Sequence, residues 1–213
     1  MDSLVLATFL QQTITFFAIL DPIGISAIAL SILDTNITKT QISTIAFKAT
    51  ITILIAFFIV LISGDLVLKL FSIDENSLKV MGGIILLLMA ISMVNGKATE
   101  SKNKKEPNSK NDEELAVIPI GIPIAFGTGL FTTIIIFKHQ AQTTLDLFSI
   151  SLAFCINAFI FYLILKNSIY IKKYFGQTGQ NIITKLMGLI VGAIAVQFIV
   201  GGIVNLSKVY LNV

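Results

Sequence analysis

Charged residues, cysteine and histidine are all scarce in this sequence. Only 13% of the 213 residues are charged, and there is one cysteine, Cys155, and one histidine. A lone cysteine within an apolar run can form no disulfide inside the chain, so we interpret Cys155 as a small hydrophobic residue. No cluster of metal ligands, nucleotide-binding loop or pair of nucleophile and base is recognisable. We therefore predict that the protein is not an enzyme and uses neither a metal nor a cofactor.

An excess of positive charge and a signal peptide are missing too. The formal net charge of +3 is too small to indicate a nucleic acid partner. The first residues, Met1-Asp2-Ser3, include no basic region, and no small-residue cleavage site follows the first apolar run. We expect this run to remain in the mature protein.

Hydrophobic residues dominate the chain instead. They make up 55% of it, and the mean hydropathy is +0.90. Six apolar runs are each near or above the roughly 17 to 25 residues that cross a bilayer as a helix. They are Leu4–Leu33, Ile42–Ile62, Leu78–Val94, Leu115–Phe137, Leu145–Leu165 and Leu186–Leu206. These solid runs lack the alternation of a transmembrane β-barrel. The sequence therefore predicts an all-α, polytopic protein with six transmembrane helices in the lipid bilayer.

Lysines are divided unevenly between the two ends of these helices. All fifteen basic residues are lysines, and eleven fall between helices one and two, three and four, or five and six. The other four lie on the opposite side. Because lysine-rich loops stay in the cytoplasm, both termini are predicted to lie outside it.

A polar stretch near the middle divides the chain into two similar halves. Gly96–Glu114 holds five lysines and five acidic residues, which is typical of a linker. It separates a first three-helix repeat, residues 1–95, from a second, residues 115–213. Lys79-Val80-Met81-Gly82 is matched 106 positions later by Lys185-Leu186-Met187-Gly188. Because three spans bring the chain to the other side of the membrane, the second repeat must be inverted relative to the first.

Asp21 and Pro22 interrupt the first apolar run. Thirty helical residues would measure about 45 Å against a hydrocarbon core of about 30 Å, so one straight helix is not expected there. Proline removes an amide donor, and an ionisable group within a span usually faces a cavity or a partner. The pair predicts a broken helix, in which the amides near Gly24 and the hydroxyl of Ser26 can bind a ligand. A kink with Asp21 as an ordinary N-cap is the alternative.

The fourth run contains a matching break. Four residues that weaken a helix fall within eleven positions of it, namely Pro119, Pro123, Gly127 and Gly129. Gly127-Thr128 lies 106 positions after Asp21-Pro22. We predict that helices one and four are both broken near the bilayer midplane and that both breaks face one cavity, as in transporters with inverted repeats.

Candidate substrate-binding residues come from both breaks and from two further spans. Asn157 and Gln197 are each central in an apolar run, where they either line the cavity or hydrogen-bond a neighbouring helix. The full set is Asp21, Pro22, Gly24, Ser26, Gly127, Thr128, Gly129, Thr132, Thr133, Asn157 and Gln197.

These motifs, taken together and in order, resemble the successive signatures of the MarC family over nearly the whole chain. The matching segments are Asp21-Pro22-Ile23-Gly24, Met81-Gly82-Gly83, Pro119-Ile120-Gly121-Ile122-Pro123 with Gly127-Thr128-Gly129, and Met187-Gly188-Leu189 with Ala195-Val196-Gln197. The resemblance implies a bacterial inner-membrane protein of six helices. It also implies transport of small neutral amino acids such as alanine and glycine.

The sequence departs from that family at both breaks. Asp21 stands where the family usually has asparagine, and Thr128 stands where it usually has proline. An ionised Asp21 would repel a carboxylate and occupy the amides meant for it. Asp21 is therefore protonated, or it holds a coupling cation, or the substrate has changed. Thr128 can bond a backbone carbonyl or the substrate.

The sequence thus supports a secondary transporter of small neutral amino acids or similar small solutes, with export as one of the directions left open. A proton or cation would be coupled at Asp21, and one repeat would rock against the other around the breaks. The alternative is a membrane scaffold or partner subunit without transport, which predicts a packed interior. Assembly as a homo-oligomer is also left open.

Overall fold

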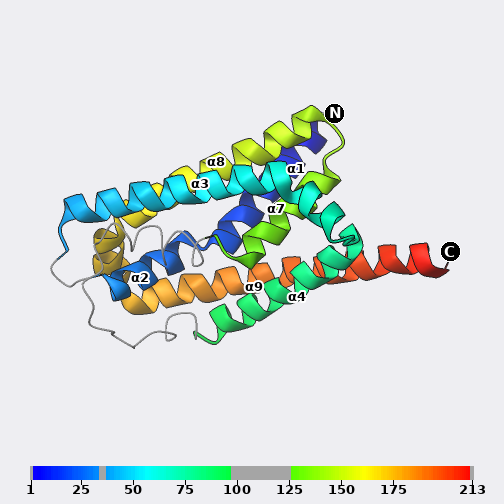
Figure 1. The fold of residues 1–213 in the computed structure, drawn as a ribbon. Coiled ribbons are helices and arrows are strands. Elements are labelled where there is room, and N and C mark those ends of the chain that lie inside the picture. Colours follow the sequence, from blue (N-terminus) through cyan, green and yellow to red (C-terminus); the bar gives the residue numbers. More distant parts are fainter. Residues whose placement is uncertain (1, 34–36, 97–125, 212–213) are drawn as a thin grey trace.

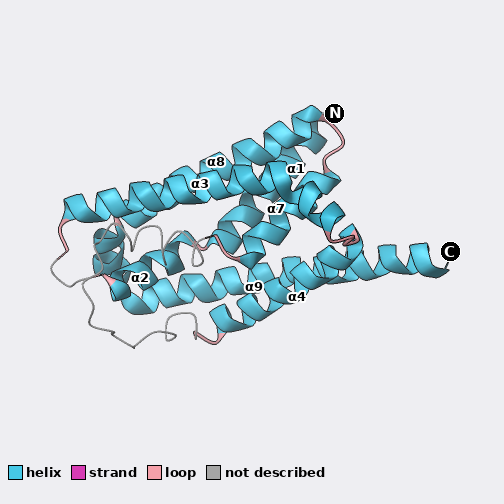
Figure 2. Ribbon diagram, in the orientation of Figure 1, coloured by secondary structure: helices cyan, strands magenta, loops and turns pink. Residues whose placement is uncertain are grey.

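The computed structural model describes residues 2–33, 37–96 and 126–211, and all its regular elements are α-helices (Figures 1 and 2). The helices are α1 (Asp2–Leu20), α2 (Pro22–Ile32), α3 (Lys39–Leu70), α4 (Glu75–Val94), α7 (Thr128–Gln140), α8 (Thr144–Lys166) and α9 (Ser168–Leu211). The predicted all-α class is confirmed. Residues 97–125, which include most of the predicted linker and the first part of the second repeat, lie outside the description.

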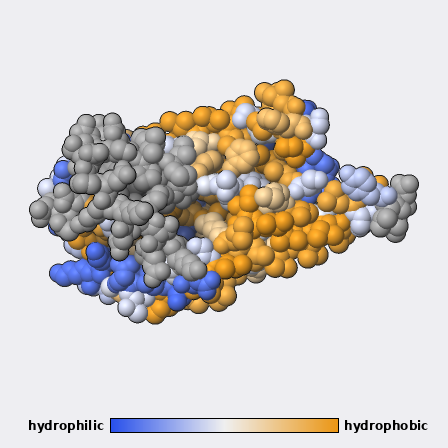
Figure 3. Space-filling view, turned by 60° about the horizontal axis from the view of Figure 1, so that its bottom comes forward, coloured by the Kyte–Doolittle hydropathy of each residue, from blue (hydrophilic) through white to orange (hydrophobic). Residues whose placement is uncertain are grey.

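Five helical segments of the described chain are long and apolar enough to cross a membrane. They are Leu6–Ser31, which combines α1 with α2, and the segments Lys39–Leu70, Glu75–Val94, Thr144–Lys166 and Ser168–Tyr210. The helix α7, with 13 residues, is the described part of the predicted fourth span. Much of the visible surface is hydrophobic (Figure 3). On α3, for example, the large hydrophobic side chains of Phe47, Ile55 and Ile62 are exposed. Such a surface suits lipid rather than water.

Capping residues fix where the second helix of each half begins. Thr38 and Gln41 form a capping box at the start of α3, and Thr143 and Asp146 form another at the start of α8. Each box satisfies two amides that the first turn would leave without partners. The two helices start at opposite ends of the bundle (Figure 1), as inversion of the second half requires.

The packing of the helices also repeats. The helix α2 contacts α9 and α8, whereas α7 contacts α4 and α3. The 106-residue offset equates α2 with α7, α3 with α8 and α4 with α9, so the two contacts of α2 correspond to the two contacts of α7. In Figure 1, α2 and α7 also run in opposite directions from the middle of the bundle. This is the arrangement that the inverted repeats predict, while the limits of the two repeats stay a prediction.

A close antiparallel contact joins the last helices of the two halves. We call it the α4–α9 seam, and its glycines are Gly83, Gly188 and Gly202. A Cβ atom on Gly83 would lie 2.8 Å from the carbonyl oxygen of Ala195, and one on Gly202 would lie 2.8 Å from that of Asn76. Only glycine permits this approach of two helix backbones.

A cluster of phenylalanines packs the helices on the other side of the bundle. The ring of Phe16 in α1 meets those of Phe57, Phe137 and Phe154 edge to face, at centroid distances of 6.2, 5.4 and 5.2 Å. The rings of Phe57 and Phe154 stack at 4.1 Å. Each such pair contributes about 0.5–1.5 kcal/mol beyond its buried area. The cluster therefore fixes α1 against α3, α7 and α8 just before the break at Asp21.

Candidate solute-binding site

The first spanning helix breaks at Asp21, where the sequence predicted it. The Asp21 amide still donates to the carbonyl of Phe17 at 3.0 Å, and the Asp21 carbonyl accepts from the amide of Ile25 at 2.9 Å. The next residue, Pro22, has no amide hydrogen that it could donate to the preceding turn. Asp21 itself has φ 39° and ψ 64°, in the left-handed region that aspartate tolerates better than most residues. The chain therefore bends within the span, and α2 begins with its first amides turned toward Asp21.

The Asp21 side chain caps the helix that it starts. Its Oδ1 accepts a hydrogen bond from the Gly24 amide at 3.1 Å, and its carboxyl group is also hydrogen-bonded by the side chain of Thr184 in α9. A Cβ atom on Gly24 would lie 2.0 Å from Oδ2 of Asp21. Gly24 is thus required because its missing side chain leaves room for this carboxyl group.

Asp21 lies on the wall of a cavity of about 200 Å³. We call it the Asp21 cavity, and its lining residues are Leu20, Asp21, Gly24, Ile25, Ala27, Ile28, Met89, Ser92, Met93, Asn181 and Thr184. They come from α1, α2, α4 and α9. The carboxyl group is the only ionisable side chain among these lining residues, and the Asp21 residue is 6% exposed. The cavity therefore combines a buried acid with three neutral polar side chains and an apolar wall.

Three polar residues of the cavity were not predicted from the sequence. Ser92 lies in α4, and Asn181 and Thr184 lie one turn apart in α9. We had expected the last span to begin at Leu186, but α9 begins at Ser168 and changes direction at Gly176, where φ is 62°. The signal for a longer helix was the spacing of Asn181 and Thr184, which places both on one face.

Ser26 is buried behind the cavity and does not line it. Its hydroxyl donates to the carbonyl of Ile23 at 2.7 Å and accepts from Nε2 of Gln180 in α9 at 3.4 Å. Pro22 is buried at the start of α2. Of the predicted residues at the first break, Asp21 and Gly24 are therefore the two that reach the cavity.

The residues predicted at the second break surround the start of α7. Gly127 is its N-cap, in extended backbone and without a side-chain cap. The hydroxyls of Thr132 and Thr133 donate to the carbonyls of Thr128 and Gly129, at 2.9 and 2.8 Å. None of these five residues lines the Asp21 cavity. The hydroxyls instead bond their own helix, as threonine commonly does within a span.

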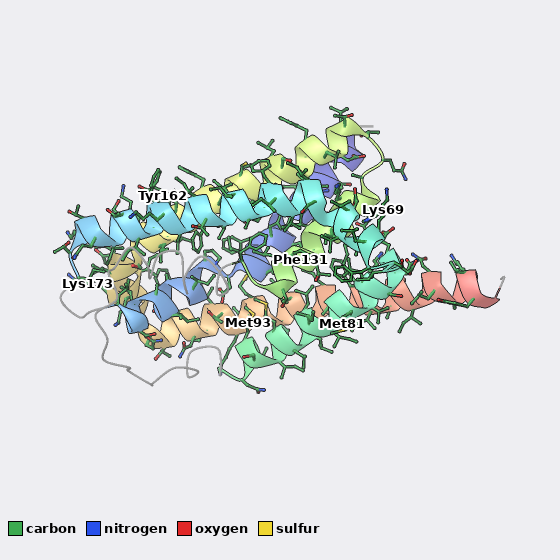
Figure 4. The ribbon with its side chains drawn as sticks, viewed as in Figure 1. Lys69, Met81, Met93, Phe131, Tyr162 and Lys173 are labelled. Carbon is green, nitrogen blue, oxygen red and sulfur yellow. The ribbon has the colours of Figure 1, made fainter. Side chains whose placement is uncertain are left out.

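Met89 lies between the two breaks. It lines the Asp21 cavity, and its sulfur is 3.6 Å from the position that a Cβ atom on Gly129 would take. Figure 4 shows the side chains of this region, with Met93 of the cavity and Phe131 in the first turn of α7 labelled. The start of α7 is thus close to the Asp21 cavity, and the flexible Met89 side chain lies between them, beside Leu86 and Ile19.

Asn157 and Gln197 lie away from the cavity. The side-chain amide of Asn157 donates to the carbonyl of Ala153 in its own helix at 2.9 Å and to that of Thr13 in α1 at 3.0 Å. The bond to Thr13 is the hydrogen bond to a neighbouring helix that the sequence offers as one of two roles for Asn157. Gln197 is exposed and lines a separate groove of about 430 Å³ between α1 and α9, together with Gln11 and Thr15.

The fold and the site define a polytopic helical membrane protein whose first span is broken around a buried carboxyl group. Over residues 6–207 the sequence matches the family described as MarC family integral membrane protein, and the chain belongs to this family. A UPF0056 membrane protein of Aquifex aeolicus is 31% identical, over 94% of each chain. The UPF0056 membrane protein YhcE of Escherichia coli is 29% identical, over 93% of each chain. No solved structure matches the chain.

Proposed function

We propose that this protein is a secondary transporter of small solutes, with small neutral amino acids as the expected class, and that the solute binds in the Asp21 cavity. The observation that carries the proposal is a cavity at a break within a spanning helix, with a buried carboxyl group on its wall. Broken helices provide backbone groups for binding in the middle of a membrane. A scaffold protein gains nothing from a buried acid beside empty space, which costs stability.

The arrangement of the halves supports alternating access. The cavity is formed by α1 and α2 of the first half together with α4 and α9, which are the two helices of the seam. The break before α7 lies behind Met89. A rocking motion of α2 and α7 about the seam would give the Met89 side chain, which comes from α4 of the seam, room to turn aside and would connect the cavity with the start of α7 in one state. A cation that binds at Asp21 would cross the membrane in the same cycle.

The chemistry of the second break complements that of the first. The helix α7 begins without a side-chain cap, so its first amides form a positive end that can bind a carboxylate. In the proposed cycle, these amides take up the carboxylate of an amino acid when Met89 moves aside.

The proposed location is the bacterial inner membrane with both termini outside the cytoplasm. The start of α1 and the end of α9 lie at the same end of the bundle (Figure 1). The helix α4 ends away from these two ends (Figure 1), and the segments that the sequence predicts on this opposite side carry eleven of the fifteen lysines. The positive-inside rule assigns the lysine-rich side to the cytoplasm.

Transport by purified protein in liposomes tests this proposal. We expect exchange of labelled alanine or glycine above that of protein-free liposomes, and at least a tenfold loss in Ser92→Phe, because the new ring fills the cavity. Ser31→Phe, at an exposed position of α2, serves as the control and should retain the activity. If no small amino acid is exchanged by the unchanged protein, the function is wrong. If Ser92→Phe folds and exchanges at the normal rate, the site is wrong.

A further inference from the structure

We propose that the Asp21 cavity binds the ammonium group of the solute, so that an amino acid enters with its amino end toward Asp21 and its carboxylate toward the start of α7. This inference rests on the proposed transport function and adds the polarity of the site. It assigns the protein a solute class that includes small primary amines and excludes simple carboxylates.

The first step concerns the amides at the start of α2. A free helix start would attract a carboxylate, but the Asp21 Oδ1 already accepts from the Gly24 amide at 3.1 Å. Pro22 provides no amide at all. A solute carboxylate at this place would have to displace the Asp21 carboxylate and then lie beside it. The first break is therefore closed to anions by its own side chain.

The second step concerns the hydrogen bonds that Asp21 can still form. An ionised carboxyl group offers about four acceptor positions, and its described contacts are with the Gly24 amide and the Thr184 side chain. No lysine lines the Asp21 cavity. A buried carboxylate without a cationic neighbour in its cavity is unfavourable until a cation enters. The remaining acceptor positions suit the donors of an ammonium group.

The other polar groups of the cavity suit the same ligand. An ammonium group has three donors and accepts nothing. The hydroxyl oxygens of Ser92 and Thr184 and the amide oxygen of Asn181 are acceptors that come from α4 and α9. Together with Asp21 they can satisfy all three donors. A carboxylate, by contrast, would find only the hydroxyl proton of Ser92 and the amide NH₂ group of Asn181, next to a negative charge, because the Thr184 hydroxyl already donates to Asp21.

The size and the apolar wall of the cavity limit the solute. About 200 Å³ corresponds to the liquid volume of roughly six to seven water molecules. Leu20, Ile25 and Met93 are among the residues that form the wall. The cavity therefore fits an ammonium group with a short alkyl body, and the uncapped start of α7 beyond Met89 provides for the carboxylate of an amino acid.

Competition among three probes of similar size tests the polarity. Exchange of labelled alanine in liposomes is measured against excess ethylammonium, propionate and unlabelled alanine. We expect ethylammonium and alanine to inhibit, and propionate to have at least a tenfold weaker effect, because a charged hydrogen bond to Asp21 is available only to the first two. Stronger inhibition by propionate than by ethylammonium would overturn the inference while leaving the transporter in place. The absence of any alanine exchange would instead remove the proposed function.

The variant Asp21→Asn removes the charge and keeps the local structure, because asparagine also tolerates a positive φ and accepts the bond from Gly24. Binding of ethylammonium to the purified variant, measured by calorimetry, should weaken at least tenfold. Asp74→Asn is the matched control, because Asp74 is the N-cap of α4 and lies outside the cavity. Unchanged ethylammonium binding in Asp21→Asn would overturn the inference. So would a variant that loses only the dependence of alanine exchange on protons or sodium, because the charge would then serve the coupling ion.

Discussion

At the scale of single residues, Asp21 combines three roles that are usually separate. Its backbone turns the chain through a left-handed conformation, its Oδ1 caps the Gly24 amide, and its ionisable group lies on the wall of a cavity. The first two roles depend on shape and hydrogen bonding, which asparagine shares. The third depends on ionisation, which asparagine lacks. Substitutions can therefore separate folding from function at this position.

A comparison of Asp21→Asn with Asp21→Ala isolates the structural roles. Both variants lack the charge, but alanine also loses the cap and is strained at φ 39°. We expect the free energy of unfolding of the alanine variant to be about 1–2 kcal/mol lower than that of the asparagine variant. Unfolding in mixed micelles, followed by circular dichroism, measures the difference. Equal stabilities would contradict the assigned cap.

Gly24→Ala tests the space that the carboxyl group occupies. The added methyl group would lie 2.0 Å from Oδ2 of Asp21, so the side chain must leave its position and the solute loses its partner. We expect alanine exchange in liposomes to fall at least tenfold. Gly192→Ala is the control, because its methyl group would meet only Cβ of Ala90, at an ordinary 3.5 Å, and its exchange rate should stay within about twofold of normal.

At the scale of helices, the seam shows how closely the two halves are joined. The Cβ position of Gly83 lies 2.8 Å from a backbone oxygen of α9, and that of Gly202 lies 2.8 Å from a backbone oxygen of α4. Backbone atoms cannot move aside as the end of a long side chain can. The two helices would have to separate to admit even a methyl group.

The variants Gly83→Ala and Gly202→Ala should therefore each lower the free energy of unfolding by about 1–3 kcal/mol. Gly201→Ala is the neighbouring control, because its methyl group would meet only the end of the Lys79 side chain, at 3.5 Å. Thermal unfolding in detergent compares the three variants. A seam variant as stable as the control would show that α4 and α9 do not pack this closely.

The helices themselves could be predicted from the sequence better than their ends. Long apolar runs identify spans because lipid favours apolar residues, and the break at Asp21 followed from one proline and one charge. The start of α9 was missed because Asn181 and Thr184 face a cavity inside the protein, and hydropathy treats such residues as loop. Met89 could not be assigned to the site either, since an apolar residue in a span carries no sign of what it contacts.

The sequence also could not show which side chains lie between the two helix starts. The repeat correctly equated the N-caps Asp21 and Gly127, which are 106 positions apart. It could not show that Met89 lies between the two helix starts, because the packing of one side chain depends on the tertiary structure. The two helix starts were therefore predictable as a pair, and the side chains that separate them were not.

At the scale of the whole molecule, the inverted halves fix which loops share a side of the membrane. The loop before α8 and the end of α9 lie at one end of the bundle, and the first part of α9 lies at the other (Figure 1). Gln142 belongs to this loop, Lys208 to the end of α9 and Lys172 to its first part. Single cysteines at these positions, in a chain with Cys155→Ala, can be labelled by a maleimide that does not cross membranes. We expect Gln142→Cys and Lys208→Cys to react in intact spheroplasts and Lys172→Cys to react only after lysis. Reaction of Lys172→Cys in intact cells would reverse the orientation.

The seam also has a consequence for how the chain is made. Gly83 in α4 meets Ile199 in α9, and a ribosome that adds roughly 5–20 residues each second needs about 6–23 seconds to travel between the two positions. During that interval the helix that packs against the glycine face of α4 has not been synthesised. Until α9 packs there, lipid or another helix must cover the surface of α4 at Gly83, and α9 must then displace that lipid or helix. The helix α9, the last of the described helices to be synthesised, thus completes the wall of the Asp21 cavity, and a chain that stops before α9 lacks the part of this wall that Asn181 and Thr184 form.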